Sequence, residues 1–112
     1  MDLYDGKLRA RDDKGGIFFD GVEQADYEKH IQEEVKPWSY MKFPYFKALG
    51  NEHGWYKVGP LARVQNCDSI PTPLADAERR EFMDYAGDSP MHSALAYHWT
   101  RMIEMLHAAE TI

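Results

Sequence analysis

The feature of the sequence that most constrains its fold is a regular row of mostly apolar residues near the C-terminal end. Its members recur at intervals of four, three, four, three and four residues: Met91, Leu95, His98, Met102, Met105 and Ala109. Trp99, Ile103 and Leu106 widen the row. This spacing predicts a helix of roughly 22 residues, about 33 Å long. Because such a helix is long for a small domain, we expect some of its packing partners to lie outside these 112 residues.

A second helix is predicted immediately before it by its start and stop signals. Thr72 is a favoured N-cap residue, Pro73 suits the first helical position, and Gly87 is a favoured stop. Ser89 and Pro90 repeat the start signal for the long helix. The sequence therefore predicts a pair of C-terminal helices.

The N-terminal part is predicted to be mixed. Apolar residues within 3–11 and 17–19 flank the turn-forming residues 12–16, which predicts a β-hairpin. Tyr27, Ile31 and Val35 recur every four residues, which predicts a helix over residues 24–35 that Pro37 ends. Residues 38–64 are rich in aromatic residues but interrupted by Gly and Pro, so we expect loops there with a short strand at 55–58.

The predicted fold is therefore one α+β domain over residues 1–112. It has an N-terminal β-hairpin, an irregular aromatic-rich middle and C-terminal helices, one of them long and amphipathic. Aromatic residues in irregular backbone either pack under loops or form a face that docks on another protein, since interfaces are enriched in them.

The charge and the cysteine content of the chain limit its partners and its compartment. A net charge of −6 and 13 scattered Lys and Arg residues argue against a phosphate-backbone binder, so we expect no nucleic acid partner. No apolar stretch approaches the ~20 residues of a membrane span, and the N-terminus lacks the features of a signal peptide. Cys67 is the single cysteine and cannot form an internal disulfide. We expect a cytoplasmic protein with no membrane contact.

Residues that could ligate a metal are too sparse for a self-contained site. No two of the five histidines have the i, i+4 spacing of a helical metal pair: His30, His53, His92, His98 and His107. Cys67 has no second cysteine nearby, whereas zinc sites show paired ligands at short spacing. Nothing brings Cys67 to a histidine as a nucleophilic pair. We therefore assign no catalytic, cofactor-binding or metal-binding residue, and an independent enzyme built on these groups is disfavoured.

Three residues are candidates for scaffold, interface or metal-neighbouring roles. His98 lies in the apolar row, either as a hydrogen-bonded core or interface histidine or as a neighbour of a cofactor that other parts of a larger protein hold. Arg101 lies beside the row and needs a partner if it is buried. Arg63 follows a Gly-Pro turn, where it either satisfies loop carbonyls or braces a partner surface. Structural roles are favoured for all three.

Three strings resemble one family. They are WSYMKFPY at residues 38–45, GWYKVGPLARV at 54–64, and TPLADAE at 72–78 followed by LAYHWTRMIE at 95–104. In order and spacing they resemble the middle of the large subunit of [NiFe]-hydrogenases, most closely the cytoplasmic, bidirectional NAD-reducing type. The resemblance covers the whole chain, and VGPLAR at 58–63 is its most specific element.

The resemblance implies a segment of a larger, mainly helical subunit whose parent enzyme reversibly oxidises H2. In that family a nickel–iron centre is held by four thiolates from two Cys-x-x-Cys pairs. A small subunit carries iron–sulfur clusters, and a flavin-containing module passes electrons to NAD. This chain has no Cys-x-x-Cys, and Cys67 matches neither pair. It is therefore expected to be inactive alone, with residues 58–63 and the long helix carried over as scaffold.

Two interpretations share these expectations. In the first, the chain is an internal piece of the large subunit that packs against the small subunit. In the second, it is a truncated, non-catalytic binding module that docks on a hydrogenase subunit or an assembly factor through its aromatic middle and its long helix. In either case exposed apolar faces favour self-association.

Overall fold

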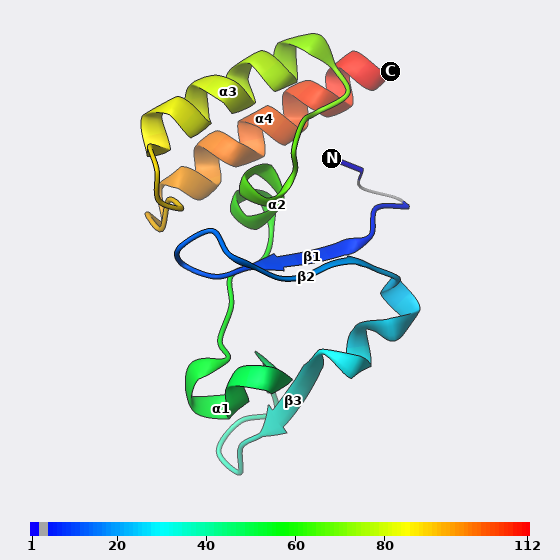
Figure 1. Cartoon of the computed structure of the whole chain (residues 1–112), viewed down its shortest axis with the longest axis vertical. Helices are drawn as coiled ribbons and strands as arrows, with labels where there is room; N and C mark the ends of the chain where they lie inside the picture. Colours follow the sequence, from blue (N-terminus) through cyan, green and yellow to red (C-terminus); the bar gives the residue numbers. More distant parts are fainter. Residues whose placement is uncertain (3–4) are drawn as a thin grey trace.

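The helices and strands lie in three tiers along the longest dimension of the molecule (Figure 1). The computed structural model describes residues 1–2 and 5–112. Helices α2, α3 and α4 form one end, the β1–β2 hairpin lies in the middle, and β3 with α1 forms the other end. Two segments connect the last tier to the rest: the 3-10 helix η1 (Gln24–Lys29) and the extended residues 54–59. The predicted α+β class is confirmed.

The helical tier contains nearly all of the buried core. It consists of α2 (Pro60–Asn66), α3 (Pro73–Ala86) and α4 (Ala96–Thr111). Its buried apolar side chains come from all three helices and the segment between α2 and α3: Leu61, Val64, Ile70, Ala75, Phe82, Ala96 and Ile103. Phe82 is fully buried, and its ring packs edge-on against Trp99 at 5.2 Å between centroids. This core fixes the mutual orientation of α3 and α4.

The β tiers are two separate antiparallel hairpins. Strand β1 (Leu8–Arg11) pairs with β2 (Ile17–Val22) in an irregular register, and β3 (Ile31–Val35) pairs regularly with β4 (Lys42–Phe46). The short helices η2 (Lys47–Leu49) and α1 (Gly50–His53) follow β4. Among the described residues before Pro60, Phe46 is the only one with a buried apolar side chain. The hairpins therefore rest on a small cluster of Phe18, Phe19, His30 and Phe46.

The predicted N-terminal hairpin and the α3 helix are confirmed. The hairpin occupies residues 8–22, and the part predicted at Leu3 and Tyr4 lies outside the described residues. Helix α3 has Thr72 at its N-cap and Pro73 as its first residue. Gly87 ends it with φ of 74°, a left-handed conformation that glycine adopts without a steric penalty.

The predicted helix over residues 24–35 is wrong in its second half. Only residues 24–29 are helical, as a 3-10 helix, and residues 31–35 form strand β3. The four-residue spacing of Ile31 and Val35 fits a strand equally well, because both lie at even separations on one face. Both residues are β-branched, which favours a strand, and pairing with β4 satisfies the backbone.

The predicted strand at 55–58 and the 22-residue helix are also wrong. Residues 54–59 form no regular structure, and the seven-residue helix α2 that follows was not predicted. Helix α4 has 16 residues and begins at Ala96 instead of Met91. The amide of Met91 is bound by Gln65, whose Oε1 accepts its N–H at 2.5 Å and whose Nε2 donates to its carbonyl at 3.2 Å. These two bonds hold the backbone of Met91 outside the helix.

Only part of the predicted apolar row faces the core: Met91 packs against it, and Ile103, which widens the row, is buried in it. Leu95, Met102 and Met105 are exposed, whereas Ala96, Thr100 and Ile103 are the buried residues of α4. Trp99 and Leu106, which widen the row, pack against that core. Helix α4 therefore has apolar residues both on its core-facing side and on its outer side. No described residue packs over the exposed Leu95, Met102 and Met105 on the outer side.

The molecule exposes more surface than a compact chain of its mass. Its accessible surface is 8014 Å², whereas a folded monomer of 13.0 kDa exposes about 6,300 Å². Its radius of gyration is 15.2 Å, against about 13 Å for a compact domain of this length. Among the described residues, no helix is long and apolar enough to cross a membrane.

Candidate docking site

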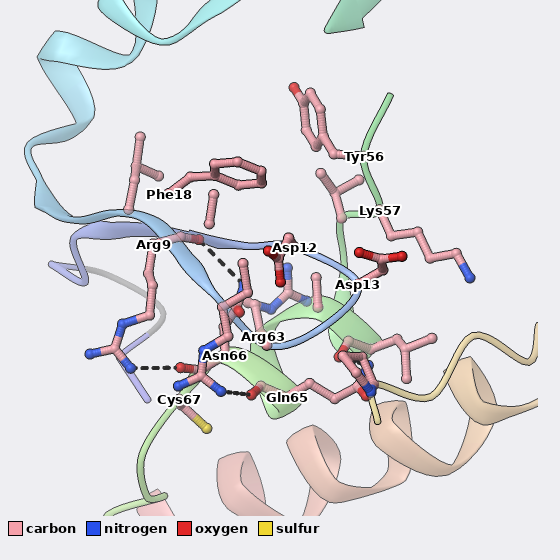
Figure 2. Close-up of a pocket in the computed structure, with 18 of the residues that line it drawn as sticks. Arg9, Asp12, Asp13, Phe18, Tyr56, Lys57, Arg63, Gln65, Asn66 and Cys67 are labelled. Carbon is pink, nitrogen blue, oxygen red and sulfur yellow. Dashed lines mark hydrogen bonds between the residues drawn. The ribbon is translucent and has the colours of Figure 1, made fainter. Parts of the chain in front are cut away.

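The middle of the molecule holds a broad cleft of about 1440 Å³ between the β1–β2 hairpin, α2 and the extended residues 54–59 (Figure 2). Figure 2 shows Phe18 and Tyr56 at one side of it, with Gln65, Asn66 and Cys67 along α2 and its C-terminal end. The cleft lies where the hairpin meets the helical tier, so its polar contacts determine how the two parts are joined.

Arg9 fastens the hairpin to the end of α2. Its Nε and Nη2 each donate to a carboxylate oxygen of Asp20 at 2.9 Å. Its Nη1 donates to the Asn66 carbonyl and to Asp68 Oδ1, both at 2.8 Å. Hydrogen bonds from Arg9 lower the pKa of Asp20 and of Asp68, and the two carboxylates raise the pKa of Arg9. The guanidinium is thus fully engaged within the chain and does not offer a site for an anionic ligand.

Further contacts close the rim of the cleft. Arg11 Nη1 donates to the Gln65 carbonyl at 3.2 Å, which adds a second link from β1 to α2. Lys57 Nζ donates to the His92 carbonyl at 2.7 Å, so the extended segment 54–59 is tied to the segment before α4. Each basic side chain named here is thereby bound to a group of the same chain. The cleft is a joint between elements and not a charged ligand pocket.

Arg63 braces α2 against α4 through a two-pronged ion pair. Its Nε and Nη2 donate to Glu104 Oε1 and Oε2 at 2.6 and 2.8 Å. The hydrogen bonds to Glu104 raise the pKa of Arg63. The surface that Arg63 braces is therefore a helix of its own chain, and no loop carbonyl is bound to it among the described residues.

His98 and Arg101 lie on the exposed side of α4. Neither side chain has a hydrogen-bond or ion-pair partner within the part of the chain that the structure describes. His98 is therefore not a core histidine of these 112 residues, although it remains available to an interface. No hydrogen bond or ion pair joins Arg63, His98 and Arg101 to one another among the described residues, since Arg63 is bound to Glu104.

Two carboxylates that were not among the candidate site residues stabilise the region around the start of α3. Asp76 Oδ1 accepts the buried Ile70 N–H at 2.9 Å, and Glu110 accepts the Leu74 and Ala75 N–H groups at 3.0 and 2.8 Å. The Ile70 bond is the largest cause of the lowered pKa of Asp76. Desolvation alone would raise the pKa of Glu110, but these hydrogen bonds lower it. The partners of Glu110 are 35 and 36 residues away, so no local pattern could reveal them.

Exposed apolar side chains gather at three places. The first, the aromatic tip, is the turn between β3 and β4 with Trp38, Tyr40 and Met41. The second, the aromatic linker, comprises Trp55, Tyr56 and Val58. The third is the outer side of α4. Tyr40 is 99% exposed and Trp38 is 74% exposed, a costly arrangement unless another surface covers them.

The described residues do not fit a metal centre. No group of three His, Cys, Asp or Glu side chains among them lies close enough together to hold a metal ion. The Cys67 thiol donates to the Val64 carbonyl at 3.4 Å and is the single thiol of the chain. A nickel–iron centre with several thiolate ligands cannot be built from this set, so we derive no chemical step through one.

Comparison with known proteins finds similarity to hydrogenase subunits. The chain is 44% identical over its full length to 23% of the NAD-reducing hydrogenase HoxS subunit beta of Cupriavidus necator. It is 40% identical over its full length to 24% of an iron-sulfur subunit of the F420-non-reducing hydrogenase of Archaeoglobus profundus. The chain is similar to a segment of hydrogenase subunits. It spans about a quarter of the length of these curated relatives.

A solved structure agrees with the curated hydrogenase subunits. The crystal structure of an NAD+-reducing [NiFe]-hydrogenase in the H2-reduced state superposes with a TM-score of 0.91 at 49% identity. The match covers 99% of this chain and 25% of the solved one. No family model matches the sequence. The hydrogenase and NAD-reducing character expected from the sequence therefore belongs to proteins similar to this one.

The prediction of a large subunit is corrected by these relatives. One is the beta subunit of its enzyme and the other is described as an iron-sulfur subunit; neither is described as a large subunit. The kind of subunit was predicted wrongly because the sequence segments that carry the resemblance lie in scaffold elements. Residues 54–64 contain part of the cleft wall and α2, and residues 95–104 lie mostly in α4. These elements contain no group of potential metal ligands among the described residues, so they offered no residue that identifies one kind of subunit.

Proposed function

We propose that this segment is a docking module of a hydrogenase complex, which supplies packing surface and not catalytic groups. The observation that carries the proposal is the pair of exposed aromatic surfaces, the tip at Trp38, Tyr40 and Met41 and the linker at Trp55, Tyr56 and Val58. Aromatic residues and Met are enriched at protein interfaces. The chain exposes about 1,700 Å² more than a compact monomer of its mass, which is about twice the ~800 Å² that one partner of a standard interface buries.

The similarity to hydrogenase subunits supports the kind of partner. Each relative is one subunit of a hydrogenase, so another subunit of such an enzyme is the natural surface for the tip and the linker. We take the small subunit as the first partner to test. We infer an NAD-reducing complex in the cytoplasm, whose iron–sulfur clusters and flavin lie outside this segment. Low cysteine content and the acidic charge agree with that compartment.

The test is an association measurement between the purified 112-residue chain and a hydrogenase that lacks the corresponding subunit. The NAD-reducing hydrogenase of Cupriavidus necator without subunit beta is suitable, because that subunit is 44% identical to the chain. Size-exclusion chromatography with light scattering measures complex formation, and native mass spectrometry identifies the bound subunit. We expect a stoichiometric complex.

A matched pair of variants shows whether the aromatic tip makes the contact. Tyr40→Ser should weaken association at least tenfold, because it removes a fully exposed aromatic group from the tip. Tyr27→Ser makes the same change on η1, outside the tip, and should leave association unchanged. Absence of any complex, or equal effects of the two variants, would contradict the proposed docking role.

A further inference from the structure

The outer side of α4 repeats every seven residues. Its members alternate at three- and four-residue intervals: Leu95, His98, Met102, Met105 and Ala109. At 100° per residue these five positions fall within an arc of about 80°, opposite the buried Ala96, Thr100 and Ile103. We call this row the α4 seam. A three-four spacing is the pattern by which one helix packs lengthwise against another.

The seam has no cover within the described part of the chain. Leu95 is 76% exposed, and Met102 and Met105 are about 60% exposed. The opposite side of the same helix is already packed against α2 and α3 through Thr100 and Ile103. The unfilled side therefore fits a fourth helix that would run alongside α4.

Charge at the edge of the seam specifies the chemistry of that helix. Arg101 lies beside the seam, is exposed, and has no ion-pair partner among the described residues. The two acidic side chains of α4 are already engaged, since Glu104 binds Arg63 and Glu110 binds the first amides of α3. A second copy of this chain would thus bring an unpaired Arg101 and no free α4 carboxylate to the contact. The matching helix must carry an acidic residue level with Arg101.

We propose that the α4 seam is covered by a helix from the part of the hydrogenase subunit that lies outside these 112 residues. That helix has an apolar seven-residue repeat and an Asp or Glu opposite Arg101. The relatives are about four times as long as the chain, so their remaining length is ample for such a helix. This contact is separate from the aromatic tip and linker, which belong to the proposed docking function.

Overlapping 21-residue peptides that cover the whole subunit beta of the Cupriavidus necator enzyme provide the probe. They are immobilised as an array, together with peptides from the other subunits of that enzyme, and exposed to the labelled 112-residue chain. We expect binding to one run of subunit-beta peptides outside the matched segment, with an apolar seven-residue repeat and an acidic flank. Binding only to peptides of other subunits, or to none, would overturn the proposal.

Substitutions then show whether the bound peptide sits on the seam. Met102→Glu should weaken binding of that peptide at least tenfold, because it places a charge in the middle of the apolar row. Met41→Glu makes the same change at the aromatic tip and should leave peptide binding unchanged, while it weakens the complex with the other hydrogenase subunits. The two sites are thereby distinguished, so that failure of one proposal does not imply failure of the other.

A charge exchange provides a test that does not rely on the apolar substitution. Arg101→Glu should weaken binding several-fold, and replacing the acidic residue of the peptide by Lys should restore it. Circular dichroism confirms that each variant is folded before binding is measured. Sedimentation of the chain alone completes the test: a dimer that Met102→Glu dissociates would identify a second copy as the occupant and overturn the proposal. If the Arg101→Glu chain bound the Lys-substituted peptide no better than it binds the original peptide, that result would also overturn the proposal.

Discussion

At the scale of single residues, long-range carboxylates replace the local caps that the sequence suggests. Thr72 occupies the N-cap position of α3, yet its side chain makes no capping bond there. Glu110 from the far end of α4 binds the first free amides of α3, and Asp76 binds the amide of Ile70 just before the helix. A free amide in a buried position costs about 1–3 kcal/mol. These carboxylates therefore stabilise the fold.

Their lowered pKa values predict an acid-sensitive fold. A carboxyl group whose pKa is lower in the folded state than in the unfolded chain stabilises the fold above the unfolded value, near pH 4. That stability is lost as the pH falls through the folded value. For Asp76, the buried amide of Ile70 and the pairing with Arg80 lower the pKa. We expect the urea midpoint to fall steadily below about pH 4.

Asp76→Asn isolates the contribution of this one group. The variant should be less stable by about 1 kcal/mol at pH 7, and the difference should shrink toward zero as the pH falls to about 2.5. Asp84→Asn is the matched control, because Asp84 lies on the same helix, is exposed and has no partner among the described residues. A stability difference for Asp76→Asn that stays constant from neutral to acid pH would contradict the assigned role.

At the scale of elements, the Arg63–Glu104 pair is the polar link between α2 and α4. Exposed ion pairs typically contribute 0.2–1 kcal/mol, but here both carboxylate oxygens are bound and the Glu104 side chain is only 12% exposed. A double-mutant cycle with Arg63→Ala and Glu104→Ala should give a coupling energy of about 1 kcal/mol by urea denaturation. The same cycle on the exposed pair Asp26–Lys29 should give a value near zero. Equal coupling in both pairs would refute the special role of Arg63.

Elements whose ends are marked by local start and stop residues could be predicted from the sequence. Elements whose type or ends depend on contacts with distant residues could not. Pro73 and Gly87 bound α3 in the sequence and in the structure. The strand β3 was mistaken for helix because its pairing with β4 cannot be read from residues 31–35. The start of α4 was misplaced because Gln65, 26 residues earlier in the chain, binds the backbone of Met91.

The same contrast between local patterns and distant contacts applies to the exposed and buried surfaces. The seven-residue row on α4 was visible in the sequence, and so was the expectation that it needs a partner outside the chain. Which side of α4 the core would take was not visible, because the buried side includes the small Ala96 and the polar Thr100, which the apolar pattern does not mark. Packing against α2 and α3 placed that side in the core. The hydrogen bonds by which Arg9 links β1 to the end of α2 could not be predicted, because its partners Asn66 and Asp68 are 57 and 59 residues away.

At the scale of the whole molecule, stability is distributed unevenly. Helices α2, α3 and α4 share one buried core, whereas the β3–β4 hairpin relies on Phe46 and its aromatic neighbours. A two-stranded sheet is marginal in water without additional cover. The hairpin that carries the aromatic tip is therefore the part that gains most from a partner.

Hydrogen exchange can test this uneven distribution directly. Amides in α3 and α4 should exchange only through global unfolding, whereas those of β3 and β4 should exchange at least ~100-fold faster through local opening. Low concentrations of urea should accelerate exchange in α3 and α4 while leaving β3 and β4 unchanged, because global opening exposes more surface than local opening does. Similar protection in both regions, with the same urea dependence, would mean that the chain unfolds as one unit and that the hairpin needs no partner for its stability.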